Sequence, residues 1–344
     1  MILDGKRVLV TGGTGSLGAT VVRSLLRGDV GRPARITVFS RDEAKQNDMR
    51  LSFLKTPVAT DEVIYANSQQ LLRFRIGDVR DYAAIRAAIE QADVVINAAA
   101  LKQVPSCEYF PIEAVQTNIL GAGNIVRAIR ESGARVETVV GISTDKACKP
   151  VNVMGMTKAL MERIFAEANL ECPATRFVCV RYGNVIASRG SVVPLFLDQI
   201  AHGGPVTITT GEMTRFLLSL DRAVETVFAA IDSARGGETY VPRVAAARIV
   251  DVAATLIDGR DIRVTVTGVR PGEKTHEIMV SEEECHRTIA RGEYYVILPM
   301  LPELRDQEPF SPALTREYSS SEINLEGAAL REALAPFMTA ERTR

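Results

Sequence analysis

Residue types that would point to a metal site, a disulfide scaffold or a membrane protein are scarce in this sequence. Its 344 residues include no tryptophan, three histidines and five cysteines. No two cysteines form a CxxC pair, and the histidines stand far from any metal-ligand spacing, so we expect reduced thiols and no metal. No apolar run approaches the roughly 20 residues that span a bilayer.

Net charge is also nearly absent. The 41 Lys and Arg residues are balanced by 42 Asp and Glu residues, which leaves a formal net charge of -1. Such a chain has no global field for nucleic acid or an anionic membrane, so anionic ligands must be held locally. The N-terminus leads directly into a short predicted strand and lacks the roughly 7 to 15 apolar residues of a signal peptide. We expect a cytoplasmic protein with no nucleic-acid or membrane partner.

The sequence does contain a regular alternation of two patterns. Short Val/Ile-rich runs alternate with longer segments of helical period, which favours parallel strands joined by crossover helices. The predicted strands are Arg7 to Val10, Ile36 to Phe39, Leu72 to Ile76, Val94 to Ala98, Val136 to Ile142 and Phe177 to Val180. The predicted helices are Leu17 to Arg27, Tyr82 to Glu90, Ile112 to Ser132 and Gly155 to Ala168. The predicted fold class is α/β, a Rossmann doubly wound parallel sheet.

The alternation loosens after residue 184, where glycine and proline interrupt the chain more often. We predict that residues 1–184 form the Rossmann domain and that 217–240, which has helical period, returns to it. Residues 185–344 are expected to form mainly a smaller, C-terminal substrate-binding lobe and a terminal extension. Residues 56–70 have no clear period and are predicted to be a loop insertion.

Glycines cluster where the first predicted strand meets the first predicted helix. In the run TGGTGSLG at 11–18, Gly12 permits a tight turn, Gly15 lets the backbone approach a pyrophosphate, and Gly18 lets helix and strand pack closely. Free N–H groups at the helix start suit the anion. We predict a dinucleotide site formed by Gly12, Thr14, Gly15, Ser16, Leu17 and Gly18. The alternative is a glycine turn without a ligand.

The end of the second predicted strand favours NADP. NAD-selective forms of this fold place an acidic residue there for the ribose 2′-hydroxyl, whereas this chain has Ser40 and Arg41, with Lys45 nearby. A hydroxyl and two cations suit a 2′-phosphate. Asp42 follows directly and could still reach a hydroxyl, so NAD is the less favoured cofactor. Alternatively, the two cations are solvent-exposed side chains at the start of a helix and bind no ligand.

Further cofactor contacts are expected after the third and fourth strands, because ligands of this fold bind at the carboxyl ends of the strands. Asp78, followed by Val79, could accept a hydrogen bond from the exocyclic amine of adenine, although a simple turn explains it nearly as well. Ala98 and Ala99 are small and let the backbone approach the cofactor closely.

Three reactive groups follow the fifth predicted strand. Thr144, Asp145 and Lys146 bring a hydroxyl, an acid and an amine to the ligand edge. Twelve residues later, Lys158 lies early on a helix, where a lysine of this fold can hydrogen-bond the nicotinamide ribose. We predict that the trio carries the chemistry. The alternative is an ordinary surface ion pair, which would stabilise the protein by less than about 1 kcal/mol.

Eight segments follow the order found in one family. They are TGGTGSLG at 11–18, SRDEAKQ at 40–46, GDVRD at 77–81, AALKQVPSCEYFPIEAVQTN at 99–118, STDKACKPVNVMGMTK at 143–158, RYGNVIASRGSVVPLF at 181–196, MTRF at 213–216 and RPGEK at 270–274. On these segments the chain resembles the UDP-N-acetylglucosamine 4,6-dehydratases (5-inverting), which are extended short-chain dehydrogenases. The likeness is greatest to the shorter type without membrane spans.

The resemblance implies that Asp145 is the acid and Lys146 the base, and that Thr144 contacts the 4-hydroxyl of the substrate. A hydride would leave C4 for NADP⁺, and the ketone would acidify the C5 hydrogen. Lys146 would remove that hydrogen while Asp145 protonates the departing C6 hydroxyl. Return of the hydride to C6 and protonation of C5 from the opposite face would invert C5. Neighbouring opposite charges, however, favour an ionised Asp and a protonated Lys, the reverse of what these roles require.

One position departs from the wider superfamily. Most short-chain dehydrogenases have a tyrosine four residues before the helix lysine, but this chain has Met154. Because methionine cannot transfer a proton, the 4-hydroxyl proton would leave through Lys146, Thr144 or water. The alternative is an inactive paralogue.

The substrate side of the site is expected to bind a UDP-sugar. The resemblance places Lys102 and the 184–189 loop there, and guanidinium groups bind phosphate bidentately, which suits a UDP pyrophosphate. Tyr182 is expected to line the cofactor cleft as packing. Surface cations are the alternative for the arginines. The expected substrate-binding residues are Lys102, Met154, Asn184, Ser188, Arg189, Arg215, Arg270 and Glu273.

The sequence therefore predicts an NADP-dependent UDP-N-acetylglucosamine 4,6-dehydratase with C5 inversion, a hydro-lyase. Its product would be UDP-2-acetamido-2,6-dideoxy-L-arabino-hexos-4-ulose, for surface polysaccharide or glycoconjugate biosynthesis. The alternatives are a UDP-sugar 4-epimerase and a non-catalytic NADP-sensing protein. An epimerase needs no acid for C6 and normally retains the tyrosine, and a sensor would lose the polar trio. The resemblance also implies a homo-oligomer.

Overall fold

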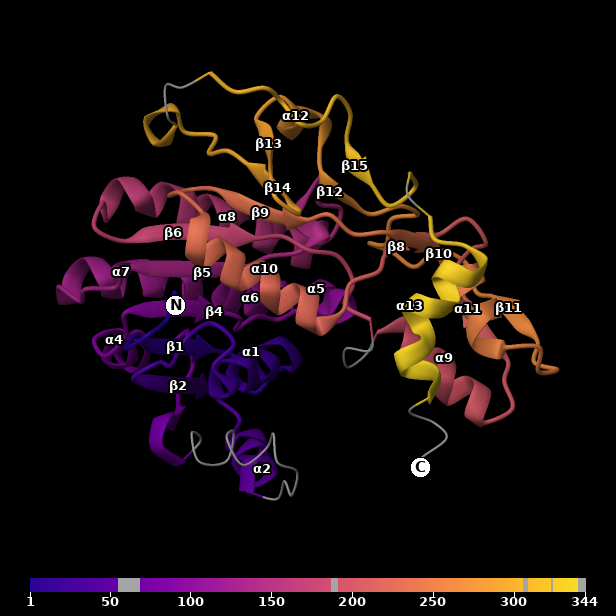
Figure 1. Ribbon diagram of the computed structural model, residues 1–344, viewed down its shortest axis with the longest axis horizontal. Helices are drawn as coiled ribbons and strands as arrows, with labels where there is room; N and C mark the ends of the chain where they lie inside the picture. Colours follow the sequence, from indigo (N-terminus) through magenta and orange to yellow (C-terminus); the bar gives the residue numbers. More distant parts are fainter. Residues whose placement is uncertain (55–68, 187–190, 306–308, 323, 340–344) are drawn as a thin grey trace.

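The computed structural model describes residues 1–54, 69–186, 191–305, 309–322 and 324–339. Within these residues, nine strands form the main sheet, in the order β13-β14-β9-β6-β5-β4-β1-β2-β3 (Figure 1). The parallel strands are β1 (Arg7–Thr11), β2 (Arg35–Ser40), β3 (Leu72–Ile76), β4 (Val94–Asn97), β5 (Thr138–Ile142), β6 (Arg176–Val180) and β9 (Thr239–Pro242). The predicted insertion at 56–70 falls almost entirely outside the described residues.

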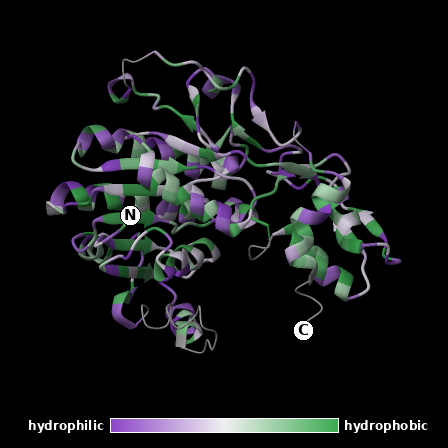
Figure 2. Cartoon of the chain, viewed as in Figure 1, coloured by the Kyte–Doolittle hydropathy of each residue, from purple (hydrophilic) through white to green (hydrophobic). Residues whose placement is uncertain are grey.

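Helices cover both faces of this sheet, which explains why its strands read as continuous apolar runs. One hydrophobic cluster lies under α1 (Ser16–Arg27), α2 (Glu43–Leu54) and α10 (Leu220–Ser233). The other lies under α4 (Tyr82–Ile89), α7 (Gly121–Ser132) and α8 (Val153–Glu171). Figure 2 shows the resulting apolar interior along the strands. The predicted doubly wound fold is confirmed.

The helix predicted over Ile112 to Ser132 is present, but it contains a π-helical turn. The chain forms α5 (Val104–Tyr109), α6 (Pro111–Ala114) and a π-helical turn, η1 (Val115–Leu120), before α7 begins. In the π turn, the Asn118 side chain accepts from the backbone N–H of Leu101 and donates to the Thr157 hydroxyl. These bonds tie the loop after β4 to α8. Helical periodicity alone does not distinguish a π turn from an α-helix.

A smaller lobe packs at the right of Figure 1. It consists of α9 (Val192–Ala201), β7 (Val206–Ile208), β8 (Thr214–Phe216), β10 (Ala246–Arg248), α11 (Ile249–Ile257), β11 (Val264–Val266) and α13 (Gly327–Thr339). Apolar side chains of α9, β7, β10, α11 and α13 share one cluster, which includes Phe196, Leu256 and Leu334.

Part of the chain predicted for the second lobe instead extends the main sheet. After β9, the hairpin of β13 (Thr288–Arg291) and β14 (Tyr294–Ile297) adds two antiparallel strands. Nearby, β12 (Ile278–Val280) pairs with β15 (Tyr318–Ser319), and the short α12 (Glu282–Cys285) follows β12. In the part of the chain that the structure describes, every helix is too short or too polar to cross a membrane.

Candidate active site

A cavity of about 790 Å³ opens at the carboxyl ends of the parallel strands. Its lining includes residues that follow β1, β3, β4, β5 and β6, together with the end of β2. Parallel strands bring residues distant in sequence to one edge in this way, and ligands of open α/β sheets bind there.

The glycine-rich turn forms one wall of the cavity. Gly12 has a φ of +64°, which favours glycine, and a Cβ there would lie 2.7 Å from the carbonyl oxygen of Ala98. A Cβ on Gly18 would lie 2.6 Å from the Cα of Gly13, so α1 packs directly on the turn. Gly15 is the N-cap of α1 and leaves the first helical N–H groups without a side-chain cap. The wall comprises Gly12, Thr14, Gly15, Ser16, Leu17 and Gly18.

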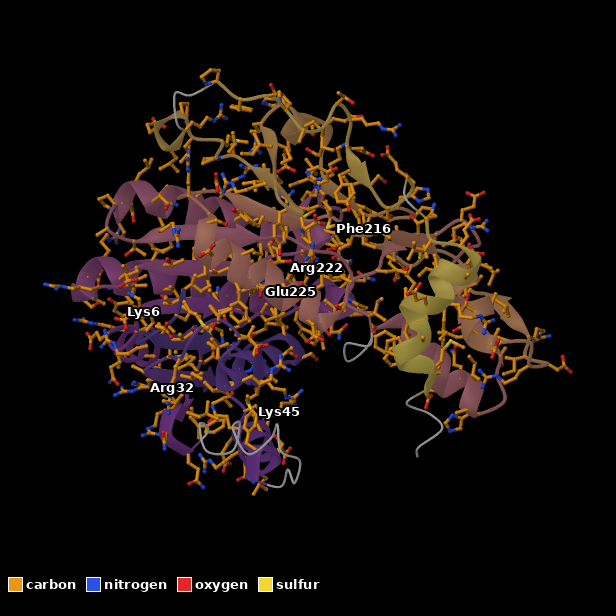
Figure 3. All side chains as sticks on the ribbon, in the orientation of Figure 1. Lys6, Arg32, Lys45, Phe216, Arg222 and Glu225 are labelled. Atoms are coloured by element: carbon orange, nitrogen blue, oxygen red, sulfur yellow. The ribbon has the colours of Figure 1, made fainter. Side chains whose placement is uncertain are left out.

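Two cations lie at the cavity beside the end of β2. The Ser40 hydroxyl accepts a hydrogen bond from the Gln46 amide at 3.1 Å. Arg41 is exposed, and its guanidinium lies 3.8 Å from the carboxylate of Asp78. The Lys45 ammonium lies 2.8 Å from Asp42, and Figure 3 shows Lys45 on α2, below the main sheet. Ser40, Arg41 and Lys45 all line the cavity.

Asp78 also lines the cavity, with Val79, Ala98 and Ala99. Its carboxylate accepts from the Arg80 guanidinium at 2.8 Å. Burial raises the pKa of Asp78, but the hydrogen bonds from Arg80 and the nearby charge of Arg41 outweigh it and hold the pKa below its usual value. Asp78 is therefore a carboxylate that can only accept hydrogen bonds.

The trio lies where β5 ends. Thr144 is the N-cap of a 3-10 turn, η2 (Asp145–Ala147), and its hydroxyl donates to Asp145 Oδ1 at 2.9 Å. Lys146 Nζ donates to the same oxygen at 3.0 Å. Asp145 is fully buried, and its Oδ2 has no hydrogen-bond partner among the described residues. Thr144 and Lys146 line the cavity, whereas Asp145 does not.

Lys146 also contacts a carboxylate that the sequence analysis missed. Its Nζ lies 3.2 Å from Oε1 of Glu277, the residue before β12, and donates to Asn184 Oδ1 at 3.0 Å. Burial lowers the pKa of Lys146, but the carboxylates of Asp145 and Glu277 outweigh it, and the pKa is raised. Lys146 is therefore an ammonium in this structure. The only sequence signal for Glu277 is its place three residues after the RPGEK segment.

Lys158 and Met154 project from the first turns of α8. Lys158 Nζ donates to the carbonyl oxygen of Ile142 at 2.7 Å, and burial lowers the pKa of Lys158 to about 8. Met154 is 4% exposed and packs with Cys107 and Ala114. Lys158, Met154 and the buried Tyr182 all line the cavity.

The predicted substrate residues are not all brought to the cavity. Lys102, Asn184, Arg270 and Glu273 line it, and Oε2 of Glu273 is buried without a partner among the described residues. Arg215 does not line the cavity, because its buried guanidinium donates to the backbone carbonyls of Thr214 and Thr275. The other two predicted residues, Ser188 and Arg189, lie outside the described residues.

The fold and the site define an extended short-chain dehydrogenase with a polar trio at its ligand edge. Residues 8–299 match the family described as polysaccharide biosynthesis protein, and the chain belongs to that family. Over 302 residues it is 43% identical to a UDP-glucose 4-epimerase of Rickettsia canadensis, and the aligned region covers 86% of this chain and 84% of that protein. It is 40% identical over 310 residues to a UDP-N-acetylglucosamine 4,6-dehydratase (inverting) of Campylobacter jejuni, with 89% and 86% covered.

Solved structures agree with the fold. Pen from Bacillus thuringiensis superposes with a TM-score of 0.86 at 31% identity and covers 98% of this chain and 99% of its own. The dTDP-glucose 4,6-dehydratase DesIV from Streptomyces venezuelae, solved with NAD and TYD bound, gives a TM-score of 0.65 at 22% identity, with 78% and 86% covered. The resemblance found in the sequence is thus confirmed at the level of the family.

Proposed function

We propose that this protein is a UDP-N-acetylglucosamine 4,6-dehydratase that inverts C5 and uses NADP. One observation carries the proposal: an acid and an amine, Asp145 and Lys146, lie 3.0 Å apart where β5 ends, and Lys146 lines the cavity. The usual tyrosine is replaced there by Met154. Elimination of water across C5 and C6 needs an acid and a base together, which this pair supplies.

The preference for NADP rests on the cavity wall beside β2. Arg41 and Lys45 provide two cations and Ser40 a hydroxyl, which suit the 2′-phosphate of NADP. The uncapped N–H groups of α1 suit the pyrophosphate, and Lys158 would donate to the nicotinamide ribose. When bound, the cofactor supplies the acceptor, and later the donor, of the hydride.

In the proposed reaction the protein moves protons at three substrate atoms. Thr144, which directly precedes Asp145 and Lys146, contacts the 4-hydroxyl of the sugar. The proton of that hydroxyl leaves through Thr144, Lys146 or water. Lys146 removes the C5 hydrogen after C4 has become a ketone, and Asp145 protonates the C6 hydroxyl as it departs. Protonation of C5 from the opposite face then gives UDP-2-acetamido-2,6-dideoxy-L-arabino-hexos-4-ulose, for surface polysaccharide or glycoconjugate biosynthesis.

A UDP-sugar 4-epimerase is the second candidate, and the names of several relatives at 42% and 43% identity favour it. An epimerase would use the same fold and hydride transfer at C4, but it would have no use for an acid at C6. The buried Asp145 beside Lys146 therefore favours dehydration.

Incubation of the pure protein with UDP-N-acetylglucosamine and NADP⁺ in D₂O separates the two functions. Dehydration is expected to give a product that has lost water and carries deuterium at C5, measured by mass spectrometry and NMR. Formation of unlabelled UDP-N-acetylgalactosamine would show an epimerase instead. If neither product forms but NADP binds, a non-catalytic NADP sensor is the remaining candidate.

We also propose that the protein is a homo-oligomer in the cytoplasm. Five large apolar side chains are 51–82% exposed on or beside α5, α6, η1 and α8, elements that pack against one another: Tyr109, Phe110, Ile112, Leu120 and Leu160. Exposed apolar groups of this kind often mark protein interfaces. All five cysteines are free and buried, as expected in a reducing compartment. Sedimentation of the wild type and of Ile112→Glu is expected to show an oligomer that the substitution dissociates.

A further inference from the structure

Glu277 is a buried carboxylate that the proposed reaction does not yet use. The residue is 1% exposed. Its backbone N–H donates to the Ser320 hydroxyl at 2.9 Å, and the Ser320 N–H donates to its carbonyl oxygen at 2.8 Å. The C-terminal segment thus holds Glu277 in place, and β12, which follows it, packs against the Asp145–Lys146 turn.

The two oxygens of this carboxylate differ in their surroundings. Oε1 lies 3.2 Å from Lys146 Nζ and 3.9 Å from Arg215 Nε. Oε2 is buried and has no hydrogen-bond partner among the described residues. A buried carboxylate oxygen without a partner is unfavourable, and its lone pairs are used by no other group of the described residues. The carboxylate of Glu277 therefore lies beside the Lys146 ammonium and has lone pairs free to accept a proton.

Lys146, in contrast, is protonated, whereas a base needs a free lone pair. Its three N–H bonds face three acceptors: Asp145 Oδ1, Asn184 Oδ1 and Glu277 Oε1. An ammonium group has no lone pair, so it cannot take the C5 hydrogen until one of these protons leaves. Transfer of this proton to Asp145 would give a neutral Lys146 and a protonated Asp145, as the reaction requires. Asp145 could then not accept the proton that leaves the 4-hydroxyl, which would have no acceptor.

Other charged groups lie around the two residues. Arg215 and Lys274 add positive charge, and Lys274 Nζ donates to the carbonyl oxygen of Cys148 at 2.6 Å. The ring of His276, the residue before Glu277, bonds the Thr214 hydroxyl at 2.8 Å. The carboxylates facing Lys146 are those of Asp145 and Glu277.

We propose that Glu277 accepts a proton from Lys146 when the substrate binds and returns it to Lys146 once Lys146 has released the proton taken from C5 to solvent. This inference rests on the proposed dehydratase function. One Nζ–H bond of Lys146 breaks, and an O–H bond forms on Glu277, with no change in oxidation state. The neutral amine then takes the C5 hydrogen as a proton, and the C5–H electron pair passes into the enolate of the C4 ketone. Asp145 takes up the proton of the 4-hydroxyl through Thr144, whose hydroxyl contacts it, and passes that proton to the departing C6 hydroxyl. Glu277 is a positioning residue, because it acts through Lys146 and not on the substrate.

Glu277→Gln tests this role, because glutamine has nearly the same shape but cannot take up the proton. At pH 7, kcat and the rate of C5 deuterium exchange are expected to fall by about 10²–10⁴-fold, with KM little changed. The rate is expected to recover by up to about tenfold for each pH unit above 7, because Lys146 must then lose its proton to solvent. Reduction of NADP⁺ in a single turnover is expected to persist, since it precedes removal of the C5 hydrogen.

Two further variants complete the test. Glu238→Gln is the matched control: Glu238 is also 1% exposed, but it pairs with Arg291 and does not line the cavity, so kcat is expected to stay within about twofold. Glu277→Asp keeps an acid and is expected to recover at least tenfold in kcat over Glu277→Gln. If Glu277→Gln does not fold, the pH profile of Glu277→Asp gives the same readout, with a shallower alkaline rise.

A loss of kcat that is equal at every pH, or no loss at all, would overturn the inference. In that case Glu277 serves only to balance buried positive charge. Failure of the wild type to release water from UDP-N-acetylglucosamine would instead refute the proposed function. The two failures are therefore distinguishable in one set of assays.

Discussion

Gly155, in the first turn of α8, leaves no room for a side chain beside the carbonyl oxygen of Lys146. A Cβ built on Gly155 would clash with that oxygen. The Gly155 N–H is held by the side chain of Asn152, the N-cap of α8, at 2.8 Å. The helix start and the turn that carries the trio therefore pack without a side chain between them, and each fixes the place of the other.

Gly155→Ala is expected to push this turn away from the helix. We expect the free energy of unfolding to fall by about 1–3 kcal/mol, as for other overpacked sites, together with a loss of kcat. Chemical denaturation and steady-state assays would measure the two effects. Gly123→Ala is the matched control, because a Cβ on this residue of α7 meets nothing within 4 Å. It is expected to stabilise the protein by about 0.5–1 kcal/mol, and equal effects of the two substitutions would contradict the prediction.

Lys146→Arg is expected to retain the buried charge pairs but lose the base. A guanidinium group can face Asp145 and Glu277, yet it does not give up its proton in proteins. Deuterium exchange at C5, followed by NMR, is expected to fall by about 10²–10⁴-fold. The melting temperature should change far less than in Lys146→Ala, which leaves both carboxylates without their lysine. Exchange at the wild-type rate in Lys146→Arg would show that another group removes the C5 hydrogen.

Arg41→Ala is expected to weaken binding of NADP⁺ but not of NAD⁺. Charge-assisted hydrogen bonds contribute about 1.5–3 kcal/mol, so the Kd for NADP⁺ should rise by about 10- to 100-fold. Isothermal titration calorimetry with both cofactors measures the change. Arg130→Ala, which removes an arginine paired with Glu171 on the α7–α8 side, serves as the control and should alter neither Kd. A similar loss of affinity for both cofactors would mean that Arg41 does not read the 2′-phosphate.

Stability is expected to depend on pH through Lys158. Burial lowers the pKa of Lys158 to about 8, so below pH 8 the lysine is protonated in both the folded and the unfolded chain. In that range the buried charge reduces the free energy of unfolding by its full amount. Above pH 8 the folded protein loses this proton before the unfolded chain does. The destabilisation therefore decreases with pH and is gone once the pH exceeds the ordinary pKa of lysine. Lys158→Met should therefore gain up to about 3 kcal/mol near pH 7, less the lost hydrogen bond to Ile142, and this gain should shrink by pH 10.

Urea denaturation at both pH values measures this effect. Lys6→Met is a suitable control, because Lys6 is about one-third exposed and pairs with Glu137 at the surface. The difference between Lys6→Met and the wild type should vary little between the two pH values. A Lys158→Met variant whose relative stability is the same at pH 7 and pH 10 would contradict the lowered pKa.

Met154→Leu is expected to retain activity, because a side chain that transfers no proton needs only to fill its place. A volume-conserving exchange in the cluster with Cys107 and Ala114 should cost less than about 1.5 kcal/mol, and kcat should stay within a few-fold. Met154→Tyr adds volume in the same place and is expected to be the less stable variant. Steady-state assays and thermal melts of both variants test this, and a large loss of kcat in Met154→Leu would give the thioether a direct role.

Sequence alone determined the elements that depend on local pattern. The apolar strands, the helices of the first domain and the turn at Gly12 to Gly18 follow from periodicity and from glycine at fixed spacing, which reflect contacts between near neighbours in the chain. The trio was found for a similar reason: the residue that ends a buried parallel strand must emerge at the ligand edge. The π turn at Val115–Leu120 was missed, because its apolar period differs little from that of an α-helix.

Only the tertiary structure decided what surrounds the trio. Glu277 reaches Lys146 because β12 and the segment at Ser320 pack against the turn after β5, and no spacing in the sequence encodes that contact. Arg215 has the residue type of a phosphate ligand, yet the fold buries its guanidinium against backbone carbonyls. The sequence thus placed an acid and an amine together, and the electrostatics of their protonation depend on a carboxylate brought from a distant part of the chain.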